Sequence, residues 1–287
     1  MNTRHPAGLP ASLTGVDHAL VIGVLNVTPD SFSDGGKFAN VDAAISHGIS
    51  LRDQGASFID VGGESTRPGA SRVSADEEQL RVLEVIAGLK AAGVATSIDT
   101  MHASTAAAAV RAGAFMVNDV SGGLADPEML SAVAELRVPY VIMHWRGHST
   151  EMNALTSYSD VVADVIDELG TRIDAAMRAG IAREAIVIDP GLGFAKETND
   201  NWAILKNLSA FDVLDFPILI GASRKRFIGS LLQGDDGIAR PVDQRDIATD
   251  AISALAAAAG VWAVRVHDVA GSVDAVRVGS AWRLGRG

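Results

Sequence analysis

Residues 21–36 read VIGVLNVTPDSFSDGG, an apolar run that passes into a polar loop with two glycines. The small and apolar residues before Asn26 predict a strand buried on both faces, and the Pro, Asp, Ser and Gly residues that follow cannot continue it. A buried strand that ends in a carboxamide and enters such a loop is typical of an α/β enzyme whose chemistry lies beyond its strand ends. A surface hairpin is the alternative for this stretch alone, because such loop residues occur in every fold.

The rest of the chain repeats this alternation of strand and helix. Helical patterns include residues 41–54, 127–137 and 161–178, and residues 74–77 (SADE) predict a capping box at the start of another helix. Seven further segments predict buried strands that end at or lead into polar residues: 57–63, 94–99, 115–119, 139–144, 185–190, 217–222 and 262–267.

Eight strands that alternate with helices, without a break in composition, predict a single (β/α)8 TIM barrel over residues 17–287. The length fits, because such barrels typically contain about 250 residues. We expect residues 1–16 to form a flexible N-terminal arm. A doubly wound open sheet is the structural alternative, but no Gly-x-Gly-x-x-Gly motif follows the first strand.

Composition narrows the choice of partners. Lys plus Arg number 24 and Asp plus Glu number 35, and the resulting net charge of −11 argues against a nucleic acid or an anionic membrane. The sequence has no Cys, which excludes disulfides and thiolate metal sites. Residues 1–10 lack an apolar signal core, and the longest apolar run, 251–264, is shorter than the roughly 20 residues of a membrane span. We therefore expect a cytoplasmic protein that acts on small molecules.

Polar residues at the strand ends should gather at one mouth of the barrel, because the carboxyl ends of its strands converge there. Carboxylates and basic groups collected in a concave site are costly unless a ligand uses them. A single polar residue can instead satisfy neighbouring backbone groups, and we expect this structural role for Asp119. The predicted ring contains Asn26, Asp60, Asp99, Asn118, Asp119, His144, Asp189, Ser223, Arg265 and His267.

The basic members of this ring belong to the last two strands. Residues 223–226 (SRKR) begin a helix, and Arg265 and His267 end the final strand, where many barrels bind phosphate. We expect Lys225 to point inward and one of its two neighbouring arginines to lie on the solvated surface. This cluster predicts an anion site.

The acidic members predict a second region. A carboxylate accepts two parallel N–H bonds from an amidine-like edge, so Asp99 and Asp189 with Asn118 suit a flat heterocycle that carries such an edge. Neither a Ser-His-Asp triad nor a zinc-ligand spacing of His residues is apparent in the sequence.

Five motifs stand out in the sequence: residues 26–36 (NVTPDSFSDGG), 63–69 (GESTRPG), 189–194 (DPGLGF), 221–226 (GASRKR) and 265–269 (RVHDV). Together they resemble the motifs of the dihydropteroate synthase family. The resemblance implies the joining of 6-hydroxymethyl-7,8-dihydropterin diphosphate to 4-aminobenzoate, with release of diphosphate, in folate biosynthesis. It also implies Mg²⁺ as the cofactor, a homodimer, and inhibition by sulfonamides.

The resemblance also implies roles for individual residues. The pterin residues are Asp99, Asn118, Met143, Asp189 and Lys225, and the diphosphate residues are Asn26, Thr66, Arg265 and His267, with Asn26 also meeting the metal. The aminobenzoate residues are Thr66, Arg67, Pro68, Phe194, Ser223 and Lys225, which gives part of the predicted anion site to a substrate carboxylate. The catalytic set is Asp99, Lys225, Arg265 and His267.

The residues also favour a particular order of bond events. An aryl amine is neutral at physiological pH and no His-acid pair is aimed at it, so we expect little general-base catalysis. Charge stabilisation at the leaving group instead predicts a dissociative step through a pterin cation, with Asp99 stabilising the spreading positive charge.

Two alternatives to the synthase remain at this stage: a pterin-dependent methyltransferase domain and a catalytically silent pterin-binding paralogue. The methyltransferase domains share the barrel and the pterin acids but should lack the two long loops of residues 27–36 and 64–72. Departures from the family pattern lie at Trp145 and in the rim of residues 148–157.

Overall fold

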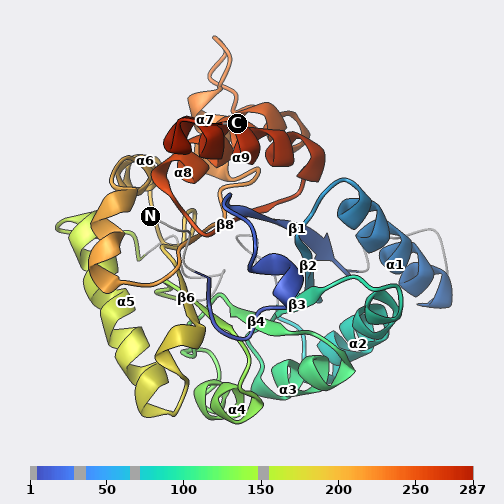
Figure 1. Ribbon diagram of the computed structural model, residues 1–287. Helices are drawn as coiled ribbons and strands as arrows, with labels where there is room; N and C mark the ends of the chain where they lie inside the picture. Colours follow the sequence, from blue (N-terminus) through green and yellow to red (C-terminus); the bar gives the residue numbers. More distant parts are fainter. Residues whose placement is uncertain (1–4, 29–36, 65–71, 148–154, 287) are drawn as a thin grey trace.

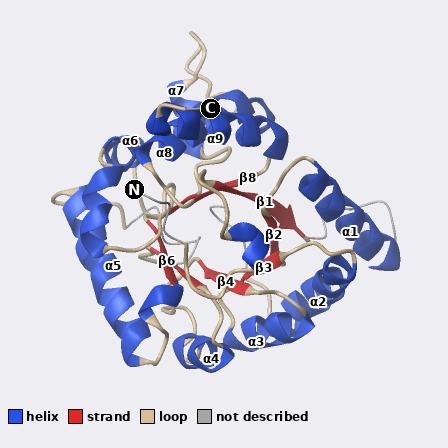
Figure 2. Ribbon diagram, in the orientation of Figure 1, coloured by secondary structure: helices blue, strands red, loops and turns tan. Residues whose placement is uncertain are grey.

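The computed structural model describes residues 5–28, 37–64, 72–147 and 155–286, which form a barrel of parallel strands inside a ring of helices (Figure 1). Figure 2 shows the strands at the centre and the helices around them. The predicted (β/α)8 barrel is confirmed. Its strands are β1 (Leu20–Asn26), β2 (Phe58–Gly62), β3 (Thr96–Asp99), β4 (Met116–Asp119), β5 (Tyr140–Met143), β6 (Ile186–Asp189), β7 (Leu219–Ile220) and β8 (Ala263–Val266).

The strands follow the order β6-β5-β4-β3-β2-β1-β8-β7, and every pair in this series is parallel. The barrel closes between its two edges, where Ile188 and Ile218 form a parallel bridge and the Ile188 N–H donates to the Pro217 carbonyl over 2.9 Å. β7 is shorter than the predicted strand of residues 217–222, because only Leu219 and Ile220 pair regularly with β8.

The helices keep the predicted alternation. Ser74 caps its helix by accepting a hydrogen bond from the Glu77 N–H over 3.2 Å, which is one of the two bonds of the predicted capping box. The helix predicted at 161–178 has those bounds in the structure, where Asp160 caps it. The helices are α1 (Lys37–Asp53), α2 (Ala75–Ala91), α3 (Ala103–Ala112), α4 (Met129–Leu136), α5 (Val161–Arg178), α6 (Thr198–Lys206), α7 (Arg226–Leu231), α8 (Asp246–Ala259) and α9 (Val269–Leu284). None of those described combines the length and the apolar character that a membrane span requires.

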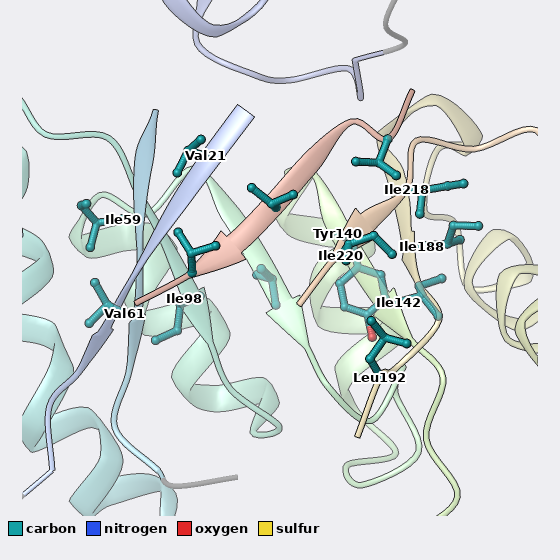
Figure 3. Packing of buried hydrophobic residues seen from close by; sticks show 14 of the residues in the cluster. Val21, Ile59, Val61, Ile98, Tyr140, Ile142, Ile188, Leu192, Ile218 and Ile220 are labelled. Atoms are coloured by element: carbon teal, nitrogen blue, oxygen red, sulfur yellow. The ribbon is translucent and has the colours of Figure 1, made fainter. Parts of the chain in front are cut away.

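Successive side chains of each strand face opposite sides of the barrel wall. One apolar cluster fills the amino-terminal end of the interior and includes Phe58, Met116, Val141, Val187 and Leu219. The next residue of each strand belongs instead to the cluster between barrel and helices, which includes Ile59, Val117, Ile142, Ile188 and Ile220 (Figure 3). These two layers fix which residues of every strand can face the interior.

The segment before β1 lies across the end of the barrel that is opposite the mouth. Leu13, in the short helix η1 (Ala11–Leu13), is 7% exposed and joins the interior cluster. Nearer to the N-terminus, the Ala7 backbone N–H donates to the Glu184 carbonyl over 2.7 Å. The sequence predicts a flexible arm over residues 1–16, and the described part of it, from His5 on, has these fixed contacts.

Candidate active site

A polar layer lies directly above the apolar layer inside the barrel, towards the carboxyl ends of the strands. It arises from the two-residue period of a strand, because each of its members is two positions beyond an apolar interior residue. The polar members are Asp60, two positions after Phe58; Asn118, two after Met116; Asp189, two after Val187; and Arg265, two after Ala263. Met143 and Gly221 occupy the same positions on β5 and β7, two residues after Val141 and Leu219.

Arg265 ties two buried carboxylates together. Its Nε donates to Asp60 Oδ2 over 2.6 Å, and its Nη2 donates to Asp99 Oδ2 over 2.7 Å. Asp60 is 1% exposed and also accepts from Asn118 Nδ2 at 2.9 Å and from Ser97 Oγ at 2.6 Å. The sequence predicts Asp60 in the ring but indicates no role for it. In the structure its hydrogen bonds to Ser97, Asn118 and Arg265 join β2 to β3, β4 and β8.

The charges of this layer are strongly affected by burial. Burial raises the pKa of Asp99 to about 7, although Arg265 opposes the shift. Burial also raises the pKa of Asp189 from its usual value, against the attraction of Lys225. Such carboxylates favour a ligand that brings hydrogen-bond donors to them.

A glycine leaves room between Asn26 and Asp99. A Cβ atom added to Gly62 would lie 3.6 Å from Asp99 Oδ2 and 3.8 Å from Asn26 Oδ1. Two oxygen atoms therefore border a space that any other residue at position 62 would fill. Oxygen atoms are the ligands that Mg²⁺ prefers, and Asn26 Oδ1 is the residue atom here that could hold the predicted ion, since Asp99 Oδ2 already accepts from Arg265.

The loop between β6 and α6 joins Asp189 to Lys225. The Gly191 N–H donates to Asp189 Oδ1 over 2.7 Å, and Lys225 Nζ donates to the Leu192 carbonyl. The same Nζ lies 4.7 Å from the centre of the Phe194 ring. Burial lowers the pKa of Lys225 to about 8, with Asp189 acting in the opposite direction. The lysine therefore points inward, as predicted.

Two residues of the anion site predicted after the last two strands lie together. Ser223 Oγ and His267 Nδ1 are 2.9 Å apart, and the His267 N–H donates to Ser223 Oγ over 3.2 Å. Arg224 turns away and binds Asp246 of α8 through two bonds of 2.7 Å, whereas Arg226 is exposed. The prediction of one solvated arginine is met by Arg226.

An apolar patch forms another part of the mouth. Met101, Val120 and Met143 are buried there, and Phe194 and Trp145 pack against them. Trp145, which departs from the family pattern, is thus part of this apolar patch. The patch offers a flat ring a surface on which to pack.

Two members of the predicted ring, Asp119 and His144, do not face the interior of the barrel, so the prediction that they belong to the ring is wrong. Asp119 and His144 each follow an inward residue, so both point out towards the helices. Asp119 accepts from the Tyr140 hydroxyl at 2.8 Å and from the Ser121 and Gly123 N–H groups, which confirms its structural role. Burial raises the pKa of Asp119 despite these bonds.

His144 lies between two charged side chains behind the barrel wall. Its Nδ1 is 2.9 Å from Lys196 Nζ, and its Nε2 is 2.9 Å from Glu168 Oε2. Because an ammonium can only donate, Nδ1 must accept and Nε2 must carry the proton. Glu168 and Lys196 have no role in the sequence prediction.

Three predicted residues, Thr66, Arg67 and Pro68, lie outside the described part of the chain. The remaining predicted site residues all lie in the described part. The structure brings Asn26, Asp99, Asn118, Met143, Asp189, Phe194, Ser223, Lys225, Arg265 and His267 to one end of the barrel.

Comparison with known proteins identifies relatives along almost the whole chain. The family model "Pterin binding enzyme" matches residues 22–267. A dihydropteroate synthase of Mycobacterium leprae is 53% identical over 91% of this chain and 93% of its own, and one of Bacillus subtilis is 45% identical over 91% and 87%.

Solved structures give the same result. A Xanthomonas albilineans dihydropteroate synthase with 4-aminobenzoic acid has a TM-score of 0.85 and 46% identity, and covers 92% of this chain and 93% of its own. A Yersinia pestis dihydropteroate synthase in a sulfonamide drug complex has a TM-score of 0.87 and 37% identity, with 98% of each chain covered. Another structure of the Xanthomonas albilineans enzyme contains 7,8-dihydropteroate, at a TM-score of 0.81 and 44% identity over 92% of this chain and 94% of its own.

The position of His144 predicts an imidazole that resists protonation. Burial lowers its pKa to about 4, and the hydrogen bond to Glu168 acts in the opposite direction. An unfolded histidine binds its proton near pH 6.5, so this group contributes stability above that pH and loses it as the pH falls towards 4. The shift corresponds to roughly 3 kcal/mol.

NMR of ¹⁵N-labelled protein should show His144 neutral at pH 5.5 with its proton on Nε2. The signal is assigned by its loss in His144→Gln. A titration midpoint near 6.5 would contradict this structure of the site.

Proposed function

The chain belongs to the pterin-binding enzymes and, among them, to the dihydropteroate synthases, and from this membership we propose how its residues divide the substrates. It is a transferase (EC 2.5.1.15) that joins a dihydropterin diphosphate to 4-aminobenzoate and forms 7,8-dihydropteroate in folate biosynthesis. The observation that carries this conclusion is 53% identity to a synthase over 91% of the chain. The names of the relatives favour the synthase over the methyltransferase domain.

The pterin is proposed to bind the acidic side of the mouth, through Asp99, Asn118, Asp189 and Lys225. The pterin edge presents parallel N–H donors, and a buried carboxylate is the acceptor that suits them. The raised pKa of Asp189 supports this role, because donors from a ligand would replace the water that burial removes. Met143 would pack against the ring from the apolar patch.

The diphosphate is proposed to bind Asn26, Arg265 and His267, with Thr66 as a further ligand outside the described residues. The guanidinium of Arg265 on β8 and the imidazole of His267, directly after that strand, provide donors for phosphate oxygens. The space beside Gly62 would hold Mg²⁺ next to Asn26 Oδ1. A magnesium ion takes few protein ligands and completes its shell with water and substrate phosphates, so one amide oxygen is a sufficient anchor.

The aminobenzoate is proposed to bind between Ser223, Phe194 and Lys225, with Thr66, Arg67 and Pro68 completing the pocket outside the described residues. The Phe194 ring offers a face for stacking, and the Ser223 hydroxyl offers a hydrogen bond to the carboxylate. Lys225 would then lie between the two substrates, beside Phe194 and opposite Asp189. Relatives solved with sulfonamides support the proposal that such drugs also bind this pocket.

The proposed reaction is dissociative. The bond between the pterin methylene carbon and the bridging oxygen breaks, and its electron pair leaves with the diphosphate. Arg265 and His267 hold the departing anion, while Asp99 stabilises the cation in the pterin ring. The amine nitrogen then bonds to the carbon and releases one proton to solvent. Mg²⁺, when bound, supplies further positive charge to the diphosphate oxygens.

The proposed assembly is a cytoplasmic homodimer formed through α8 and α9. Both helices expose large apolar side chains on the outside of the barrel: Ile247 (87% exposed), Leu255 (71%), Val278 (65%) and Trp282 (82%). The two helices are in close contact at Gly279, where an added Cβ would lie 2.1 Å from the Ala254 carbonyl oxygen. The exposed Leu255 and Val278 are sequence neighbours of this contact, so a second copy could cover one joint apolar face.

A binding and activity assay tests the pterin assignment. With Mg²⁺, dihydropterin diphosphate and 4-aminobenzoate, the unmodified chain should form dihydropteroate and diphosphate. Asp189→Asn should lose activity and bind free pterin more weakly by about 1–3 kcal/mol, because an amide leaves one pterin N–H without an acceptor. Calorimetry measures this, and Asp167→Asn on the exposed face of α5 is the control. Unchanged affinity in a folded Asp189→Asn would remove this carboxylate from the pterin site.

An isotope experiment tests the dissociative step and its need for Mg²⁺. Substrate labelled with ¹⁸O at the carbon-oxygen bridge is incubated without aminobenzoate. Return of a rotated diphosphate to the cation should move the label into non-bridging positions, and a chelator should abolish this exchange. Absence of exchange in Mg²⁺, together with kinetics of direct displacement, would leave Asp99 with a binding role alone.

A charge placed on the apolar face should separate the proposed dimer. Trp282→Glu should sediment as a monomer at concentrations where the unmodified chain is a dimer, since a carboxylate is costly to bury at an interface. Leu80→Glu on α2, at a residue that is 60% exposed, is the matched control and should remain dimeric. A dimeric Trp282→Glu would place the interface elsewhere.

A further inference from the structure

The loop between β6 and α6 has an unusual backbone for its length. Gly191, Gly193 and Ala195 all have positive φ angles, of 71°, 75° and 47°. A positive φ is costly for alanine, so other contacts must hold the loop in this shape. The shape matters because the loop carries Phe194 and accepts the bond from Lys225.

Lys196 holds the loop from behind. Its side chain is buried at 4% exposure, and its Nζ has three partners: the Gly191 carbonyl at 3.0 Å, the Phe194 carbonyl at 3.1 Å and His144 Nδ1 at 2.9 Å. These three partners use all the donors of an ammonium group. The loop is thus bound to two lysines, Lys196 on the side of the helices and Lys225 on the side of the mouth.

Tyr158 holds the same loop at its end. Its hydroxyl donates to the Ala195 carbonyl over 2.8 Å, at the residue with the strained backbone. The ring of Tyr158 lies 3.8 Å from the Arg146 guanidinium, which binds Glu168 through two nitrogens. Glu168 in turn binds His144, the partner of Lys196. The contacts from Lys196 to Tyr158 therefore form one continuous network behind the loop.

Among the acids that are assigned to the pterin, Asp189 is the one that this network meets. The His144 backbone N–H donates to the Asp189 carbonyl over 2.8 Å, and while burial raises the pKa of Asp189, the charge of Lys196 opposes that rise. Asp99 and Asn118 are instead held by Arg265 and Asp60 on the other side of the barrel. Displacement of the loop should therefore affect Phe194 and Lys225 more than Asp99 and Asn118.

We propose that Lys196 and Tyr158 are positioning residues for the aminobenzoate side of the reaction. They set the shape of residues 191–195, and through it the place of the Phe194 ring and of the carbonyl that Lys225 binds. Neither residue touches substrate. The proposal rests on the proposed division of the site between the two substrates. Burial lowers the pKa of Lys196 to about 7, because an ammonium group loses its hydration in this position.

Steady-state kinetics separates a positioning role from a merely structural one. Lys196→Met keeps the length of the stem and removes all three donors, so the KM for 4-aminobenzoate should rise about tenfold or more. The KM for the pterin diphosphate and the affinity for free pterin should change by a smaller factor, because Asp99 and Asn118 are held independently of the loop. A merely structural role would reduce the amount of folded enzyme, which lowers the apparent kcat and leaves both KM values unchanged. Lys206→Met, at an exposed position of α6, is the matched control.

A second variant keeps the test decisive if Lys196→Met does not fold. Tyr158→Phe keeps the ring under Arg146 and removes only the hydroxyl, so it should raise the KM for aminobenzoate selectively, by a smaller factor. Unchanged constants in folded Lys196→Met, or in Tyr158→Phe where the first variant fails to fold, would overturn the proposal. An equal rise in both KM values would also overturn it. If the unmodified chain makes no dihydropteroate, the assigned function fails instead, which is a separate result.

Discussion

The site depends on one guanidinium that joins two carboxylates inside the barrel. Two ionised acids on neighbouring strands, in an interior closed to water, would repel one another and lose their hydration. Arg265 offsets part of both costs because its fork donates in two directions, to Asp60 and to Asp99, although burial still raises the pKa of Asp99 to about 7. A lysine at this position would present a single point of charge. The acids on β2 and β3 can therefore remain beside each other as acceptors for a ligand.

The register of the strands explains why an arginine is needed. Arg265 pairs with Ile22, which pairs with Phe58 on β2, so in the pairing register its backbone is level with Phe58. Asp60 lies two residues further along its strand, and Asp99 pairs with Gly62, two residues beyond that. The long side chain of Arg265 covers this offset and connects the last strand to the second and third.

The fold and most of the mouth could be predicted from the sequence, because alternating strands and helices leave a periodic pattern and polar residues mark the strand ends. The side of the barrel wall that a single residue faces could not be predicted. Strands buried on both faces are apolar at every position, so their sequence does not tell inward from outward residues. For this reason the sequence predicts Asp119 and His144 in the ring, although each lies one position beyond a residue that faces the interior. Lys196 follows a glycine-containing loop and looks like a surface cation. Its burial depends on His144 and on the folding of the loop, neither of which leaves a local signal.

Charge is separated across the mouth in a way that can orient the substrates. The carboxylates come from β2, β3 and β6. Arg265 lies on β8, His267 comes directly after it, and Ser223 and Lys225 lie in the loop between β7 and α7. A pterin diphosphate has N–H donors at one end and an anion at the other, so on the proposed assignment only one orientation satisfies both sides. The Ser223–His267 hydrogen bond then places the anionic ends of the two substrates next to each other. Two anions in a partly buried site repel, and the nearby cations must offset that repulsion for both to bind. Release of the diphosphate from the mouth removes one of the two anions, so on the proposed assignment this repulsion favours its departure once the carbon-oxygen bond has broken.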